Sequence, residues 1–187
     1  MGLVCRNRRQ FFRKVTGLVA IGATAPMFSK TAHASLNNEQ LIRRLAFYNL
    51  HTGERTQGVF YANGAFQNDV LKAFDQNLRD HRQNEAAPMD RRLFDFLDQI
   101  QQRLGTNNEI HIISGYRSPK TNAMLAGKST QVAKKSFHMK GMAIDFAIPG
   151  IDLKLVRDTA KSLKLGGVGY YPNSGFVHID TAWVRSW

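Results

Sequence analysis

Residues 136–146 have the sequence SFHMKGMAIDF, and they decide the fold because they join a histidine and a glycine turn to a short apolar strand. Asp145 stands inside that strand, between Ile144 and Phe146. An ionised carboxylate in apolar surroundings costs several kcal/mol unless it is paired, hydrogen-bonded or bound to a metal. The pattern therefore favours a functional site, although an alternating strand could also direct Asp145 to solvent.

A second stretch, residues 176–180 with the sequence FVHID, repeats this arrangement. His178 and Asp180 should project from one face, because strand side chains alternate with a period of two. A catalytic zinc ion typically takes three protein ligands and keeps a fourth position for water, whose pKa falls toward about 7. His138, Asp145 and His178 would satisfy that count. His138 and Asp145 alone could equally be ordinary loop and strand residues.

The rest of the chain predicts an α+β fold. Aromatic and β-branched residues flank a polar turn at residues 51–54, which indicates a β-hairpin of residues 45–50 and 56–61. Apolar residues at steps of three and four predict amphipathic helices over residues 68–81, 90–104 and 153–163. Pro88 is expected to open the second helix, with Asp90 in its first turn, and Gly105 to close it.

Further strands are expected around the two polar stretches. The candidates are residues 110–113, 141–148 and 176–180, with 166–171 as an additional edge strand. Ser118 and Pro119 supply an N-cap and a first-turn proline for a helix through Leu125. Arg117 therefore lies at a junction between a strand and a helix.

Composition indicates an ordinary folded protein with a concentrated N-terminal charge. The formal net charge of the 187 residues is +12, but residues 1–34 carry six basic residues and no acidic one, and the remainder has a net charge of +6. Such a charge fits work beside an anionic polymer or membrane surface and only weakly suggests nucleic acid. Cys5 is the single cysteine, which excludes an intrachain disulfide and a cysteine-based zinc site in the folded domain.

Residues 1–34 have the layout of an export signal: a basic stretch, an apolar stretch of about a dozen residues, and Ala32-His33-Ala34 as a cleavage site. Residues 7–14, NRRQFFRK, resemble the twin-arginine motif. The apolar stretch is shorter than the roughly 20 residues that span a bilayer. We therefore expect the twin-arginine translocase to export the chain to the periplasm, with cleavage after Ala34 and no stable membrane span. An amphipathic helix that stays attached is the alternative.

From Ser35 onward there is no internal repeat or long linker, so residues 35–187 are expected to form a single domain. The chain resembles the MepK/YcbK branch of murein endopeptidases, within the zinc D-Ala-D-Ala carboxypeptidase superfamily whose fold hedgehog proteins share. The resemblance begins with a His-x6-Asp motif, formed by His138 and Asp145, and with His178 in a later strand. It continues in four separated segments: residues 49–54 (NLHTGE), 113–118 (ISGYRS), 132–136 (VAKKS) and 166–172 (GGVGYYP).

This resemblance implies a small, mostly antiparallel sheet with helices packed on it. It also implies a zinc metallopeptidase that hydrolyses the peptide stems of peptidoglycan at cross-links, including the 3-3 type between diaminopimelate residues. His138, Asp145 and His178 would bind Zn2+. Arg117 would bind a substrate carboxylate or polarise the scissile carbonyl, as guanidinium chemistry permits. A surface ion pair is the alternative role for Arg117.

One position departs from the pattern of the wider superfamily, whose members commonly carry an acidic general base three residues before the last zinc ligand. Gly175 occupies that position here. Asp180 is the expected substitute, either as the proton acceptor or as the group that holds a ligand, unless it only caps its strand. Tyr170 and Tyr171 are candidates for substrate binding, although aromatic pairs beside glycines are as often packing anchors. His111 is a further candidate base, and a satisfied structural histidine is its simpler interpretation.

Two other classes of function stay open at this stage. The first is a non-catalytic peptidoglycan-binding module that retains a structural zinc, which the glycine at position 175 makes a real alternative. The second is a nucleic-acid binder, which would need no zinc and would bind less tightly as salt rises; export argues against it. We expect an enzyme that acts on peptidoglycan as a monomer and does not bind nucleic acid.

Overall fold

The predicted hairpin lies toward one end of the sheet. In a computed structural model of the protein, which describes residues 41–129 and 132–187, strand β1 (Arg43–Asn49) pairs antiparallel with β2 (Arg55–Ala62). The signal predicted for residues 1–34 lies outside the described residues. Within the described residues, no helix has the length and apolar character needed to cross a bilayer.

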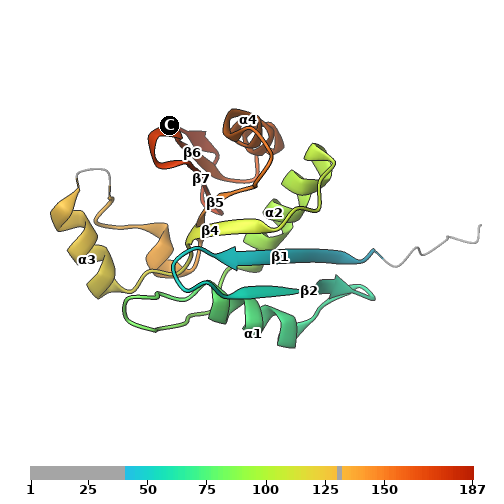
Figure 1. Cartoon of the computed structure of the whole chain (residues 1–187), viewed down its shortest axis with the longest axis horizontal. Coiled ribbons are helices and arrows are strands. Elements are labelled where there is room, and N and C mark those ends of the chain that lie inside the picture. Colours follow the sequence, from blue (N-terminus) through green and yellow to red (C-terminus); the bar gives the residue numbers. More distant parts are fainter. Residues whose placement is uncertain (1–40, 130–131) are drawn as a thin grey trace, which may run out of the picture. The chain divides into compact units, whose positions relative to one another are not determined.

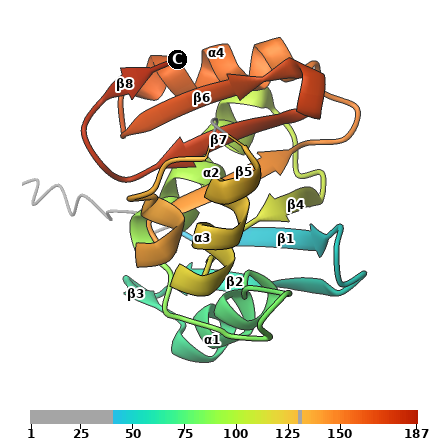
Figure 2. The same ribbon diagram turned by 90° about the vertical axis from the view of Figure 1, so that its left-hand side faces the viewer.

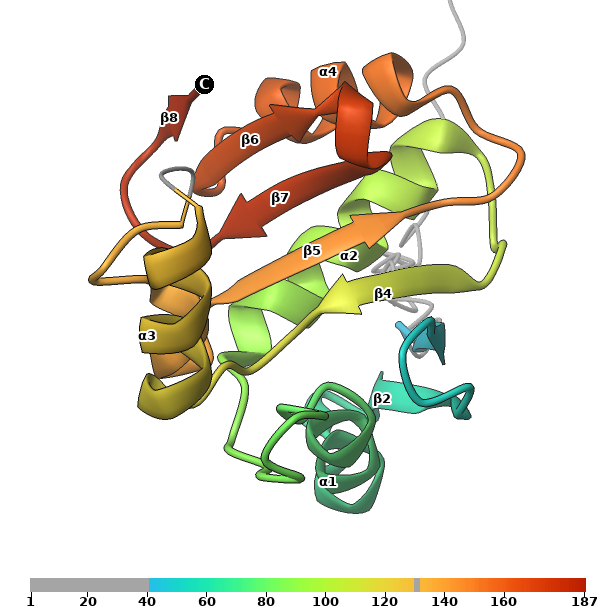
Figure 3. The same cartoon turned by 60° about the vertical axis from the view of Figure 1, so that its left-hand side comes forward.

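The hairpin belongs to a mixed sheet of eight strands with the order β3-β2-β1-β4-β5-β7-β6-β8, which can be followed in Figure 2 and from other sides in Figures 1 and 3. The remaining strands are β3 (Ala65–Phe66), β4 (Ile110–Ser114), β5 (Ala143–Ala147), β6 (Gly167–Tyr171), β7 (Phe176–Asp180) and β8 (Arg185–Ser186). All neighbours are antiparallel except β1 with β4 and β6 with β8. The mostly antiparallel α+β fold is therefore confirmed. The expected edge position of β6 is wrong, because β8 pairs with its free side.

The described residues form four α-helices beside the sheet: α1 (Asn68–Asn77), α2 (Arg91–Leu104), α3 (Pro119–Lys128) and α4 (Leu153–Leu163). Helix α1 packs on the hairpin, α2 packs on β1 and α4, and α4 packs on β6 and β7. Figure 2 shows α3 in front of the sheet and α2 behind it. Two short 3-10 helices, η1 (Phe137–Lys140) and η2 (Pro172–Ser174), precede β5 and β7.

Helix ends follow the capping chemistry with two corrections. Asp90 was expected in the first turn of α2 but is its N-cap. Its carboxylate accepts a hydrogen bond from the backbone amide of Arg92. Gly105 closes α2 in the left-handed conformation, and Ser118 caps α3, as predicted. Helix α1 ends at Asn77 and not at His81, because the carbonyl of Leu78 accepts the amide of Tyr116 while Asp80 and Glu85 form a bridge.

The core lies between the sheet and helices α1, α2 and α4. Four fully buried rings occupy its hairpin side, with centroids 4.7 to 6.5 Å apart: Phe47, Phe60, Phe74 and Phe94. Burying such a side chain stabilises the fold by roughly 1.5–3 kcal/mol. Toward the other end of the sheet, on the same face, β5 and β7 direct four apolar side chains into the core: Ile144, Phe146, Val177 and Ile179. Alternation then turns Asp145, His178 and Asp180 to the opposite face.

Candidate metal centre

Register brings the polar residues of the two stretches into one row across the sheet. Asp145 of β5 lies opposite His178 of β7, and His178 lies opposite Gly169 of β6. Oδ1 of Asp145 is 2.7 Å from Nδ1 of His178. Because strand neighbours in register share a face, this contact follows from the pairing of β5 with β7.

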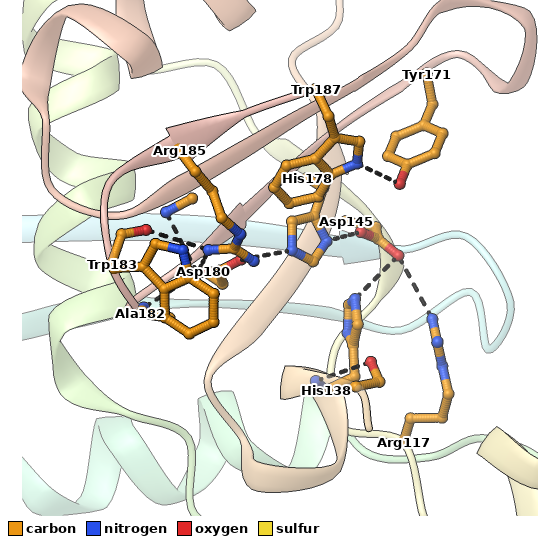
Figure 4. A network of polar contacts seen from close by, with 12 residues as sticks. Arg117, His138, Asp145, Tyr171, His178, Asp180, Ala182, Trp183, Arg185 and Trp187 are labelled. Atoms are coloured by element: carbon orange, nitrogen blue, oxygen red, sulfur yellow. Dashed lines mark hydrogen bonds and ion pairs between the residues drawn. The ribbon is translucent and has the colours of Figure 1, made fainter. Parts of the chain in front are cut away.

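His138 reaches the same point from η1. Ser136 caps η1 by accepting the amide of His138, and Gly141 ends it with φ +65°. A side chain at position 141 would collide with the carbonyl of Pro88, so the glycine is needed for space as well as for its backbone conformation. The ring is only 3% exposed, and its Nε2 lies 3.3 Å from Oδ2 of Asp145 (Figure 4).

A backbone hydrogen bond selects which nitrogen of His138 faces the cluster. Nδ1 lies 2.7 Å from the carbonyl oxygen of Gly115, an acceptor only, so Nδ1 carries the hydrogen and donates it. Nε2 then presents its lone pair toward Asp145. Metal-bound histidines typically donate a hydrogen bond in this way, from the second ring nitrogen to a carbonyl or carboxylate oxygen.

His178 has the same type of second contact. Its Nε2 lies 3.1 Å from Oδ2 of Asp180, which leaves Nδ1 to face Asp145. One ligand atom each from His138, Asp145 and His178 lies within 4.8 Å of the others. Two imidazole nitrogens and a carboxylate oxygen are donors that suit zinc, so the residues fit the ion that the sequence implies.

Charge is concentrated on the Asp145 carboxylate. Burial opposes its ionisation, but the neighbouring imidazoles of His138 and His178 outweigh burial and hold its pKa well below the usual range. Burial lowers the pKa of His138. Burial also disfavours protonated His178, yet hydrogen bonds to Asp145 and Asp180 raise its pKa to about 9. A bound divalent cation would replace the proton that His178 shares with Asp145.

Asp180 is enclosed completely, with 0% of its side chain exposed. Both its oxygens are engaged, because it accepts from His178, from both terminal nitrogens of Arg185 at 2.9 and 2.7 Å, and from the amides of Gly167 and Ala182. Burial disfavours the charged carboxylate, and the contacts with His178 and Arg185 nevertheless lower the pKa of Asp180. The carboxylate is therefore a fixed acceptor behind His178.

Arg117 borders the cluster from the loop between β4 and α3. Its amide donates to the carbonyl of His138, and its guanidinium lies 3.1 Å from Oγ of Ser114 and 3.6 Å from Oδ2 of Asp145. Burial lowers the pKa of Arg117, but guanidinium stays charged in proteins. The charge lies beside the cluster, where it can meet an anionic group.

These residues line a pocket of about 310 Å³, which is within the usual size range of ligand sites. Asp145 is the single carboxylate among its described lining residues. The pocket is also lined by Lys135, Phe137, Tyr171, Phe176, Arg185 and Trp187. Its surroundings are therefore cationic and aromatic.

The structure separates the remaining candidates from the pocket. Tyr170, expected at the cleft, faces α4, where the guanidinium of Arg157 lies 4.5 Å from its ring centre; its neighbour Tyr171 lines the pocket. His111 packs edge-on against Tyr48. Gly175 is an exposed turn residue with φ +73° and places no acid near the cluster. The sequence could not decide between Tyr170 and Tyr171, because alternation gives the period of a strand but not the face that each residue takes.

Sequence reasoning missed Arg185 and Trp187. Arg185 lies in the edge strand β8, which is too short for a periodic signal. Trp187 packs against His178, with ring centroids 5.4 Å apart, and its Nε1 donates to the hydroxyl of Tyr171 at 2.8 Å. The closely spaced glycines at 167 and 169 were the available hint, because glycines in a strand often mark a close approach by another group.

The chain is similar over its length to proteins of one family. Residues 37–187 match the model of the family described as peptidoglycan L,D-endopeptidase MepK. A probable peptidoglycan L,D-endopeptidase MepK of Haemophilus influenzae is 43% identical over 188 residues, covering 100% of this chain and 98% of that protein. The peptidoglycan L,D-endopeptidase MepK of Escherichia coli K12 is 42% identical over 175 residues, covering 94% of this chain and 96% of that protein. No solved structure is significantly similar.

Proposed function

The chain belongs to the MepK family of peptidoglycan L,D-endopeptidases, and we propose that it is a zinc-dependent hydrolase of peptidoglycan cross-links, including the 3-3 links between diaminopimelate residues. The observation that carries the proposal is the convergence of His138, Asp145 and His178 on one point in the wall of a pocket. Family membership supports the peptidoglycan endopeptidase activity. The two imidazole nitrogens and the carboxylate oxygen support zinc as the bound metal.

His138, Asp145 and His178 are the proposed zinc ligands. His138 would use Nε2, because its Nδ1 is committed to Gly115, and His178 would use Nδ1, because its Nε2 faces Asp180. Zinc held there supplies Lewis-acid chemistry, which lowers the pKa of water and polarises a carbonyl group. The low pKa of Asp145 keeps this ligand ionised at neutral pH.

Arg117 is proposed to act on the substrate. An amide under attack develops negative charge on its carbonyl oxygen, and a fixed cation beside that oxygen stabilises the charge. Because the Arg117 side chain is only 12% exposed and its amide is tied to the backbone of His138, it is held in place before the substrate arrives. A substrate carboxylate would be bound by the same guanidinium in a two-pronged geometry.

Asp180 is proposed to hold His178 and not to accept the proton from water. Its oxygens are enclosed and already accept hydrogen bonds from several donors, so none is directed at a reacting group. These contacts support the ligand-holding role among those that the sequence left open for Asp180. A positioning carboxylate behind a ligating histidine is a recurrent arrangement in zinc sites.

The proposal also includes a cellular location, which rests on the N-terminal residues. The arginine pair at residues 8–9 and the Ala32-His33-Ala34 segment support export by the twin-arginine translocase and cleavage after Ala34. Residues 35–187 would then form the zinc peptidase domain, working as a monomer in the periplasm. An in-frame fusion to a reporter that is active only after export tests this, and Arg8→Lys with Arg9→Lys should leave the reporter inside the cell.

The decisive experiment is digestion of purified peptidoglycan with zinc-loaded and with chelated protein. We expect the zinc-loaded enzyme to convert 3-3 linked dimers to monomers, as measured by chromatography and mass spectrometry of the released muropeptides. Cross-links of the 4-3 type in the same sample measure the preference. Equal muropeptide profiles with and without zinc would overturn the proposed activity.

A non-catalytic zinc-containing peptidoglycan-binding module is the second candidate. The observation that favours it is the exposed glycine at position 175, together with a single carboxylate among the described pocket residues. This candidate predicts that zinc-loaded protein sediments with insoluble peptidoglycan and leaves every cross-link intact. The digestion experiment therefore separates the two functions.

A further inference from the structure

We propose that Arg185 is a positioning residue for His178 and that it acts through Asp180. The inference rests on the proposed zinc site, since it assigns Arg185 the task of holding one proposed ligand in its binding orientation. Arg185 lies in β8, the last strand of the sheet, beside β6. Figure 4 shows its guanidinium, the Asp180 carboxylate and the His178 ring in sequence, leading to Asp145.

The contact between Arg185 and Asp180 is two-pronged. One guanidinium nitrogen lies 2.9 Å from Oδ1 and the other lies 2.7 Å from Oδ2. Parallel hydrogen bonds of this kind fix the carboxylate plane, which a single contact cannot do. Oδ2 is also the atom that faces Nε2 of His178 at 3.1 Å. Fixing the carboxylate therefore fixes the direction in which the imidazole donates.

Three aromatic rings hold the guanidinium itself. Its central carbon lies 4.7 Å from the ring centres of Trp183 and Trp187 and 5.4 Å from that of Phe137. Cations are attracted to the faces of aromatic rings at such distances. Phe137 directly precedes the proposed ligand His138, so the enclosure contacts both histidine-bearing segments. A mobile arginine could not hold Asp180 as firmly.

The glycines of β6 provide room for this arrangement. A side chain at position 167 would collide with the guanidinium of Arg185 and with Asp180. At position 169, directly opposite His178, a Cβ would lie 2.8 Å from the indole of Trp187. Strand glycines often mark a site where another group must approach closely. Gly167 and Gly169 alternate along β6, so one face of this strand has no side chains at these positions. Arg185 and Trp187 approach that face.

The consequence for His178 is a fixed ring orientation. With Asp180 accepting from Nε2, Nδ1 is the nitrogen that faces Asp145, and its lone pair would be available to an ion that replaces the shared proton. Without Arg185, the Asp180 carboxylate would lose its strongest restraint and the imidazole could rotate. Changes to such outer partners of metal ligands typically cost about 10–100-fold in metal affinity or activity.

The test measures zinc affinity by competition with a chromophoric chelator, independently of peptidase activity. We expect Arg185→Ala to weaken zinc binding about 10–100-fold. Arg185→Lys should lie between this variant and the parent, because lysine restores the charge without the two-pronged geometry. Arg157→Ala is the matched control and should stay within about twofold of the parent. Arg157 also pairs with an aspartate and covers an aromatic ring, but it does so on α4, away from His178.

A second readout reports the ligand geometry. Cobalt-substituted parent and Arg157→Ala proteins should share one visible absorption spectrum, and Arg185→Lys should shift it, because cobalt absorption follows ligand number and geometry. Should Arg185→Ala fail to fold by circular dichroism, Arg185→Lys and Asp180→Asn decide the question by the same two measurements. Unchanged zinc affinity and an unchanged cobalt spectrum in folded Arg185 variants would overturn the inference. A parent protein that binds no zinc would instead overturn the proposed function.

Discussion

The two ends of the sheet use the same backbone pattern for different purposes. The hairpin side buries a cluster of phenylalanine rings against α1 and α2, with Phe47 and Phe74 fully enclosed. The side formed by β5, β7 and β6 buries apolar residues on its core face, and on its other face it buries Asp145 and Asp180, which are charged. Buried charges contribute little stability even when paired. The hairpin side therefore stabilises the fold, and the β5–β7 side depends on that stability to hold its buried polar residues.

The sharpest way to break this comparison is to remove a proposed ligand. His178→Ala should reduce cross-link cleavage at least about a thousandfold, equivalent to roughly 4 kcal/mol of transition-state stabilisation. It should also abolish tight zinc binding while circular dichroism stays unchanged. Muropeptide analysis and metal content provide the measurements. His111→Ala is the matched control, because His111 packs on Tyr48, and it should keep activity within about twofold.

The converse change removes apolar packing from the hairpin side. Phe74→Ala should lower the free energy of unfolding by about 3–5 kcal/mol, because the ring contacts Phe47, Phe60 and Phe94 and leaves a cavity. Urea denaturation of the metal-free protein measures the loss. Leu155→Ala, at a position that is 52% exposed on α4, should change stability by less than about 0.5 kcal/mol. Equal losses of unfolding free energy in the two variants would contradict the role of the hairpin side in stabilising the fold.

A third change acts where the two sides meet. At Gly115 a side chain would collide with the backbone of Leu78 at the end of α1, and the carbonyl of Gly115 holds His138. Gly115→Ala should therefore cost about 3 kcal/mol of stability and also weaken zinc binding. Gly127→Ala in α3 meets no neighbouring atom and should stabilise by up to about 1 kcal/mol. A stability loss with unchanged zinc affinity would show that the two sides are independent.

The smallest predicted effect concerns acid. Burial disfavours the Asp80 anion, yet hydrogen bonds from Ser118 and Arg82 lower its pKa from 3.8 to about 2. Because the folded pKa lies below the unfolded one, the carboxylate contributes roughly 2 kcal/mol above about pH 4, and this is lost as pH falls toward 2. Asp80→Asn should flatten the fall in unfolding free energy between pH 4 and pH 2.

Denaturation curves at several pH values test this prediction. Asp158→Asn is the control, because that carboxylate pairs with Arg157 at the surface, where solvent screens the charges. Its slope should follow that of the parent protein. Identical slopes for the parent and Asp80→Asn would contradict the assignment of acid sensitivity to Asp80.

The sequence predicted most of the local structure, for identifiable reasons. Helix α4 and strand β7 match their expected bounds, and α2 ends at the expected glycine, because apolar period and capping residues are local signals. The mixed pairing of β4, parallel to β1 and antiparallel to β5, was not predicted. Parallel neighbours are joined by long connections, which leave no local mark in the sequence.

The sequence by itself determined the identity of the chemistry-bearing groups. It contains a histidine beside a glycine turn, an aspartate in an apolar strand, and a second histidine two residues before an aspartate. Tertiary structure decided which nitrogen each histidine presents, that Tyr171 and not Tyr170 faces the pocket, and that Arg185 lies behind Asp180. The reason is physical: side-chain period is a property of one strand, whereas facing, register and enclosure depend on contacts between residues far apart in the chain.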